Sequence, residues 1–160
     1  MAVARLGRRR EGMLRIDIGG GLAPVPGHVN LDRVHGEGDF KRQIQEGIPV
    51  ADGTVESVRC SHLMEHIPSG YDRIGVFNEV WRVLQPGGTF EIIVPLFSGD
   101  SFGWAADPTH VSIWVEQSFW YFTGQMAAAA DYGILLWQMA DWHVVQHGWG
   151  QEGHCTLRKP

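Results

Sequence analysis

Two short β-branched runs with an amphipathic helix pattern between them constrain the fold more than any other feature of the chain. Residues 54–60 and 89–94 are bracketed by turn residues and rich in β-branched side chains, as strands are. Between them, apolar residues recur at spacings of three and four over residues 69–85, which predicts a helix that stops at the Pro-Gly-Gly of 86–88. Strand, helix and strand in this order form the crossover unit of a parallel sheet.

Further strands are predicted on both sides of this unit. Residues 13–18 are an apolar run that stops at the glycine triplet 19–21, and residues 28–31 form a second short strand. Residues 142–147 and 152–158 are joined by a Gly-Trp-Gly turn, which predicts an antiparallel hairpin at the sheet edge. The expected fold is therefore α/β, with a mostly parallel twisted sheet and an antiparallel C-terminal hairpin.

The connection between the first two predicted strands is unusually short. Only residues 22–27 separate the glycine triplet from the second strand, and Pro24 and Pro26 interrupt them. Proline inside a helix removes a backbone donor and clashes with the preceding turn. We therefore expect the first helix to be shortened or missing, so that loop amides take the place of a helix N-terminus.

Length and composition indicate a single globular domain over residues 13–160. The formal net charge of −5 disfavours general attraction to a phosphate backbone, so DNA is an unlikely partner. The basic run 8–10 lies in residues 1–12, which we expect to be a flexible tail. No apolar run is long enough to span a bilayer. Cys60 and Cys155 match no zinc or redox spacing, so a reducing, cytoplasmic location is expected.

Acidic residues stand at the ends of the first two predicted strands. Asp17 precedes the glycine triplet 19–21, where the backbone can approach a ligand closely, and Asp32 ends the second strand. In an open parallel sheet, ligands bind beyond the carboxyl ends of the strands, and a carboxylate there can accept hydrogen bonds from a ribose diol. The combination indicates a nucleoside site.

Several motifs in succession resemble the class I S-adenosylmethionine-dependent methyltransferases, and the type 11 branch in particular. The first is Leu14-Arg-Ile-Asp-Ile-Gly-Gly-Gly21, followed by Asn30-Leu-Asp32. Downstream come Ile48-Pro-Val-Ala-Asp-Gly-Thr-Val55, Cys60-Ser-His-Leu-Met-Glu-His-Ile67 and Glu79-Val-Trp-Arg-Val-Leu-Gln-Pro-Gly-Gly88. The resemblance covers about residues 14–95 and implies a Rossmann-like methyltransferase fold.

The resemblance also implies a cofactor, S-adenosyl-L-methionine, and its product S-adenosyl-L-homocysteine. The glycines would face the methionine part with Asp17 orienting their loop, Asp32 would hold the ribose, and Asp39 would accept from the adenine amino group. Residues just after the strand predicted at 54–60 would lie near the sulfonium. The implied cofactor-binding residues are Asp17, Gly19, Gly20, Gly21, Asp32, Asp39, Phe40, Ser61 and His62.

The activity that the resemblance implies is in-line displacement of the sulfonium methyl group onto a nucleophile. The acceptor is unknown. No Asn/Asp-Pro-Pro-aromatic motif follows the strand predicted at 54–60, and Cys60 lacks a flanking proline, so nucleic-acid bases are disfavoured. A small molecule, a protein or an RNA stays open as the acceptor, and the oligomeric state is open as well.

Residues 97–141 are expected to cap the acceptor side of the sheet. Their Asp107-Pro-Thr-His110 stretch resembles one that related methyltransferases carry there, and a histidine titrates near neutrality. Asp107 and His110 are therefore the candidate catalytic residues, with His110 as the base. The aromatic residues that follow at helical spacing are expected to serve the core more than a substrate platform.

Three other interpretations stay open beside this one. The chain could bind the cofactor without catalysis, as a scaffold subunit of a larger assembly. His62, Glu65 and His66 fit an H-x-x-E-H zinc hydrolase pattern, but this pattern needs a continuous helix and Pro68 follows at once. A nicotinamide-dependent oxidoreductase is weaker still, because the full G-x-G-x-x-G spacing is missing. We therefore expect no metal site.

Overall fold

The computed structural model describes residues 13–97 and 102–160, so the expected N-terminal tail with its basic run lies outside the described residues. The strands are β1 (Leu14–Ile18), β2 (Val29–Leu31), β3 (Val55–Ser61), β4 (Leu84–Pro95), β5 (Gln138–His147) and β6 (Gly150–Arg158). The α-helices are α1 (Gly70–Val83) and α2 (Phe102–Ala106). Short 3₁₀ helices are η2 (Gly38–Phe40), η3 (Ile44–Glu46), η4 (Met64–His66), η5 (Glu116–Tyr121) and η6 (Ala127–Tyr132).

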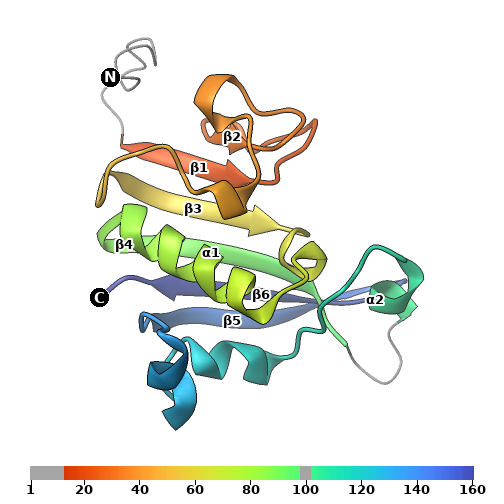
Figure 1. Cartoon of the computed structure of the whole chain (residues 1–160). Coiled ribbons are helices and arrows are strands. Elements are labelled where there is room, and N and C mark those ends of the chain that lie inside the picture. The colour runs from red at the N-terminus through yellow and green to blue at the C-terminus, as the bar shows by residue number, and fades with distance from the viewer. Residues whose placement is uncertain (1–12, 98–101) are drawn as a thin grey trace.

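The six strands form one sheet in the order β2-β1-β3-β4-β6-β5. The first four are parallel, whereas β6 runs antiparallel to both β4 and β5. Figure 1 shows the sheet with α1 lying across it and the hairpin at one side. The predicted mostly parallel sheet with an antiparallel C-terminal hairpin is therefore confirmed.

The connection between β1 and β2 contains no helix. Residues 19–28 run through turns, and Gly19, Gly21 and Gly27 adopt positive φ angles of 73°, 54° and 86°. Proline residues in this stretch exclude a helix, as the sequence predicted. Between β2 and β3, the described chain has the turns η2 and η3 in place of a further strand.

Helix α1 is amphipathic and fixes the crossover between β3 and β4. The Ser69 hydroxyl accepts a hydrogen bond from the Asp72 amide at 3.4 Å and so caps its first turn. The prediction that the helix reaches Gln85 is wrong, because Leu84 already pairs with Val55 in the sheet. Its hydrophobic side packs on the sheet through Val76, Phe77, Val80 and Val83.

The two faces of the sheet differ in character. On the face that α1 covers, Cys60, Phe90 and Leu157 are fully buried. On the opposite face, the middle of the sheet carries polar side chains that are half-buried or exposed: Arg15, Ser57, Arg59, Thr89, Glu91 and Thr156. Parallel sheets are ordinarily covered on both faces. Within the described residues, the apolar core lies mainly on one side of this sheet.

Residues 97–141, the expected cap, divide into two parts. The segment 107–112 lies against the turn after β3, where the amides of Val111 and Ser112 donate to the backbone oxygen of Glu65. The following stretch, with η5 and η6, packs on the α1 side, where Trp114 and Phe119 are buried. The expectation that these aromatics serve the core is confirmed for both residues.

Removal of the Phe77 ring should strongly destabilise the fold. Phe77 is fully buried, stacks on Phe122 with ring centroids 3.6 Å apart and meets the edge of Phe90 at 5.4 Å. The substitution Phe77→Ala should lower the free energy of unfolding by about 3–5 kcal/mol in urea denaturation. Tyr71→Ala, on an exposed position of the same helix, is the control and should change it by less than about 0.5 kcal/mol. Equal effects would show that this core is wrongly placed.

Candidate functional site

A cavity of about 520 Å³ opens at the carboxyl ends of β1, β2 and β3. Its walls come from five places in the chain: Gly19 after β1, Asp32 after β2, residues 42–45 around η3, the turn after β3, and Thr109. The turn after β3 contributes Leu63, His66 and Ile67. This is the edge of a parallel sheet at which ligands bind in open α/β folds.

The glycine turn is held in place by side chains of β2 and its end. The Gly20 amide donates to Asn30 Oδ1 at 3.1 Å, and Asn30 Nδ2 donates to the carbonyl of Gly21 at 3.0 Å. The Gly21 amide donates to Asp32 Oδ2 at 3.3 Å. These bonds hold the turn against the end of β2. Of the three glycines, only Gly19 lines this cavity, whereas Gly21 lines a separate cavity of about 450 Å³.

Asp17 lies beneath this turn, not in the cavity wall. Its carboxylate is almost fully buried, and Oδ2 accepts a hydrogen bond from the Val25 amide at 2.9 Å. Oδ1 accepts no hydrogen bond and has the Arg59 guanidinium 3.8 Å away. Asp17 thus ties the return loop to the end of β1.

Asp32 lines the cavity, and its carboxylate is ionised there. Burial alone would raise the pKa of this carboxyl, but hydrogen bonds from the backbone of His35, Val34 and Gly21 outweigh burial and lower the pKa below its ordinary value. Oδ1 accepts from the amides of Val34 and His35 at 2.7 and 2.8 Å, whereas Oδ2 accepts only the longer bond from Gly21. One oxygen therefore keeps capacity for a ligand hydroxyl.

Asp39 and Phe40, the expected adenine-side residues, do not line this cavity. Asp39 is exposed on η2, and Phe40 is buried in the core. Arg42, whose Nε donates to the Asp39 carbonyl at 2.5 Å, lies in the wall instead. The adenine role of Asp39 stays a prediction.

Ser61 and His62 also lie outside the cavity wall. His62 has a φ of 53°, which is unusual for a residue with a side chain, and its ring reaches toward β6. Its Nε2 lies 2.8 Å from Glu152 Oε1, and its Nδ1 lies 3.3 Å from Glu65 Oε1. Both carboxylates, Glu65 foremost, raise the pKa of His62 against the effect of burial. The next residue, Leu63, turns to the cavity and packs against Gly19.

The two candidate catalytic residues, Asp107 and His110, flank Thr109 in segment 107–112, and of these three residues only Thr109 lines the cavity. His110 is mostly buried, its Nδ1 lies 2.8 Å from the carbonyl oxygen of Trp104, and its Nε2 lies 3.7 Å from Asp107 Oδ2. Asp107 accepts hydrogen bonds from the hydroxyl and amide of Thr109, and these lower the pKa of its carboxyl. Neither side chain lines the cavity, so the base role of His110 stays a prediction.

The H-x-x-E-H residues do not share a continuous helix. The turn η4 begins only at Met64, and His62 precedes it with a positive φ. The His62 ring meets Glu152, whereas His66 Nδ1 lies 3.1 Å from the Thr109 hydroxyl. The side chains of His62 and His66 therefore have different partners, unlike those of a zinc hydrolase helix.

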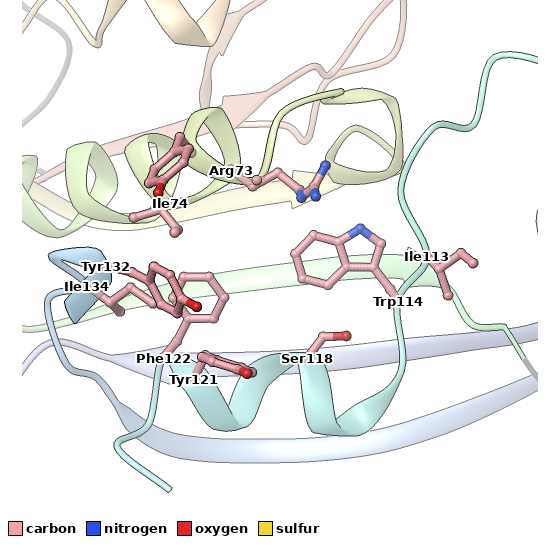
Figure 2. A pocket seen from close by; sticks show the side chains of 11 residues that line it. Arg73, Ile74, Ile113, Trp114, Ser118, Tyr121, Phe122, Tyr132 and Ile134 are labelled. Atoms are coloured by element: carbon pink, nitrogen blue, oxygen red, sulfur yellow. The ribbon is translucent and has the colours of Figure 1, made fainter. Parts of the chain in front are cut away.

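A second cavity of about 530 Å³ lies between α1 and residues 113–134 (Figure 2). Its walls are mostly apolar and aromatic, and Figure 2 shows Trp114, Phe122 and Tyr132 facing α1. Arg73, its charged residue, already donates to the carbonyls of Ile67 and Pro68. The two cavities have nearly equal volumes, so the choice of the nucleoside site depends on the residues that line them. The cavity with Asp32 and Gly19 offers a carboxylate for a ribose and fits a nucleoside better.

Comparisons with known proteins agree with this geometry. Residues 25–92 match the family Methyltransf_11, a methyltransferase domain. A chain of the complex between the Haloferax volcanii Trm112 methyltransferase activator and a methyltransferase superposes with a TM-score of 0.60 at 16% identity, covering 99% of this chain and 87% of that one. The fold is that of a class I methyltransferase.

Two further methyltransferase structures were crystallised with the cofactor or its product. The 1,6-didemethyltoxoflavin-N1-methyltransferase of Burkholderia thailandensis, with bound S-adenosylhomocysteine, has a TM-score of 0.64 at 14% identity, covering 92% of this chain and 71% of that one. The 16S rRNA (adenine(1408)-N(1))-methyltransferase from Catenulisporales acidiphilia, a W203A mutant with S-adenosylmethionine, gives 0.55 at 14%, with 92% and 84% coverage. A sequence search of curated proteins found no match.

A side chain at Gly20 should disrupt the turn of this methyltransferase fold. A Cβ there would lie 2.8 Å from both Asn30 Oδ1 and Asp17 Oδ2 and 2.9 Å from Pro24 Cβ. Gly20→Ala should therefore cost about 1–3 kcal/mol of stability, as overpacking does. Gly148→Ala, where a Cβ meets no atom within 4 Å, is the control. Thermal unfolding that is the same for both variants would contradict the tight turn.

Proposed function

We propose that this protein transfers the methyl group of S-adenosyl-L-methionine, bound in the cavity at the ends of β1, β2 and β3, to an acceptor nucleophile. The observation that carries the proposal is the meeting of Gly19, the first residue of the glycine turn, and the ionised Asp32 carboxylate in one cavity. The family match over residues 25–92 and the neighbours crystallised with the cofactor or its product support it.

The residues present fit such a cofactor. Asp32 Oδ2 has one long hydrogen bond and can accept another from a ribose hydroxyl. Gly19, which has no side chain and a φ of 73°, lines the cavity with Asp32, so a ligand there can approach the backbone of the turn. The cavity volume lies in the range of about 300–1,000 Å³ that small-molecule sites occupy.

The protein's contribution to catalysis is mainly orientation and exclusion of water. When bound, the cofactor supplies a methyl group on a positively charged sulfur, which makes the methyl carbon electrophilic. Asp32 would fix the ribose, and Leu63 and Ile67 would keep water from the reacting end. Held by Asp32 and bordered by Gly19, the cofactor would supply its methyl group to the acceptor's lone pair, with the sulfur–methyl bond as the bond that would break.

The acceptor side is proposed to lie where segment 107–112 borders the cavity. Thr109 of this segment lines it. We propose a small molecule, a protein or an RNA as the acceptor, because the neighbours named above include enzymes for a small molecule and for ribosomal RNA.

The proposal includes one domain over residues 13–160 and a cytoplasmic location, which the two buried free thiols support. None of the helices in the described ranges is long and apolar enough to cross a membrane.

Binding of S-adenosylhomocysteine should depend on Asp32. By isothermal titration calorimetry, Asp32→Ala should weaken binding by about 1–3 kcal/mol, or roughly 5- to 150-fold, because the ribose loses its charged acceptor. Asp131→Ala, an exposed carboxylate on η6, is the matched control and should leave the affinity unchanged. Folded protein that gives no heat with the product or the cofactor would refute the assignment.

Catalysis and mere cofactor binding can be separated by a transfer assay. Fractions of a cell extract are incubated with the protein and S-adenosylmethionine labelled at the methyl group. We expect label in one acceptor class, and much less with Asp32→Ala. Tight cofactor binding without transfer to any fraction would favour the alternative, a scaffold subunit that binds the cofactor.

A further inference from the structure

The side chain of Glu65 is fully buried at the turn after β3. Neither carboxylate oxygen accepts a hydrogen bond. Two histidine nitrogens lie within 4 Å of Oε1: His62 Nδ1 at 3.3 Å and His110 Nε2 at 3.9 Å. A buried carboxylate without hydrogen bonds requires a proton, an adjacent imidazolium or a metal ion.

Two histidines from different parts of the chain surround this carboxylate. His66 comes from η4 and His110 from segment 107–112, and their rings meet edge to face with centroids 4.8 Å apart. One ligand atom from each of Glu65, His66 and His110 lies within 4.8 Å of the other two. A single ion could therefore contact all three after small side-chain adjustments.

The hydrogen bonds of His110 give its ring the orientation of a metal ligand. A carbonyl oxygen only accepts, so Nδ1, at 2.8 Å from the Trp104 carbonyl, carries a proton. In the neutral ring, Nε2 then presents its lone pair to the Glu65 carboxylate. Two such electron-rich groups repel unless a cation lies between them, and a carbonyl on the far ring nitrogen is the usual support of a metal-bound histidine.

His66 has a comparable support. Its Nδ1 lies 3.2 Å from the carbonyl oxygen and 3.1 Å from the hydroxyl of Thr109, and Asp107 accepts hydrogen bonds from that hydroxyl and from the Thr109 amide. Asp107 Oδ2 is also 3.7 Å from His110 Nε2, which brings a fourth donor near the cluster. The cluster therefore has both candidate ligands and groups that orient them.

We propose that Glu65, His66 and His110 bind one divalent transition-metal ion, Zn²⁺ by its donor preference, between η4 and segment 107–112. Two imidazoles and a carboxylate form a donor set that zinc accepts, and three protein ligands leave one coordination position open. Because His66 and Thr109 line the cavity at the ends of β1, β2 and β3, the ion borders the proposed cofactor site. The site differs from the H-x-x-E-H pattern, since His110 takes the place of His62.

Metal titration of the whole chain tests this assignment without any cofactor. Protein freed of affinity tag and chelator is titrated with Zn²⁺ by calorimetry and with Co²⁺ by visible absorption. One ion per chain should bind, with Co²⁺ d–d bands, and His66→Ala and His110→Ala should each weaken binding by at least about 100-fold. His143→Ala, a histidine whose side chain is 55% exposed, is the matched control and should bind normally.

X-ray absorption at the zinc edge keeps the test decisive if a variant fails to fold. The wild-type spectrum should show two imidazole ligands with oxygen donors and no sulfur. Folded wild-type protein that binds neither ion, zinc binding that survives both histidine substitutions, or a spectrum without two imidazoles would overturn the proposal. Glu65 would then be neutralised by the His62 imidazolium. Neither readout uses S-adenosylmethionine, so failure here is distinct from failure of the proposed function.

Discussion

The return from β1 to β2 without a helix is the constraint on which the site depends. Parallel strands ordinarily need a crossover of about a dozen residues or more, usually helical, and here residues 19–28 must suffice. The loop closes because Asp17 and Asn30 supply the hydrogen bonds that a helix would satisfy internally. The Gly21 amide also donates to Asp32, whose carboxylate lines the cavity.

Local signals in the sequence were sufficient for most of the fold. The four parallel strands, α1 and the hairpin follow from β-branched runs, helical spacing and turn residues, and the prolines excluded the first helix. The end of α1 was misplaced because pairing of Leu84 with Val55 is a tertiary contact that overrides helical spacing. Asp32 could be predicted because it directly follows β2, and ligands bind at the carboxyl ends of parallel strands.

Other features of the site could not be predicted from the sequence because they depend on side-chain direction and on long-range contacts. His62 has a positive φ and its ring contacts Glu152, so Leu63 and not His62 lines the cavity. Within η2, Phe40 is the residue that enters the core, and Asp39 is exposed. Nothing near Glu65 in the sequence indicates that His110 will face it. Hydrogen bonds from two amides of segment 107–112 to the Glu65 carbonyl bring these residues together.

The sheet's polar middle face has a thermodynamic consequence. Arg15, Arg59 and Glu91 keep contact with water there while they form ion pairs, so folding removes less apolar surface from water than in a sheet covered on both sides. The heat capacity increment of unfolding scales with the apolar surface exposed, and the denaturant m-value with the total. For its length, this chain should therefore show small values of both, and a stability curve that changes only gently with temperature.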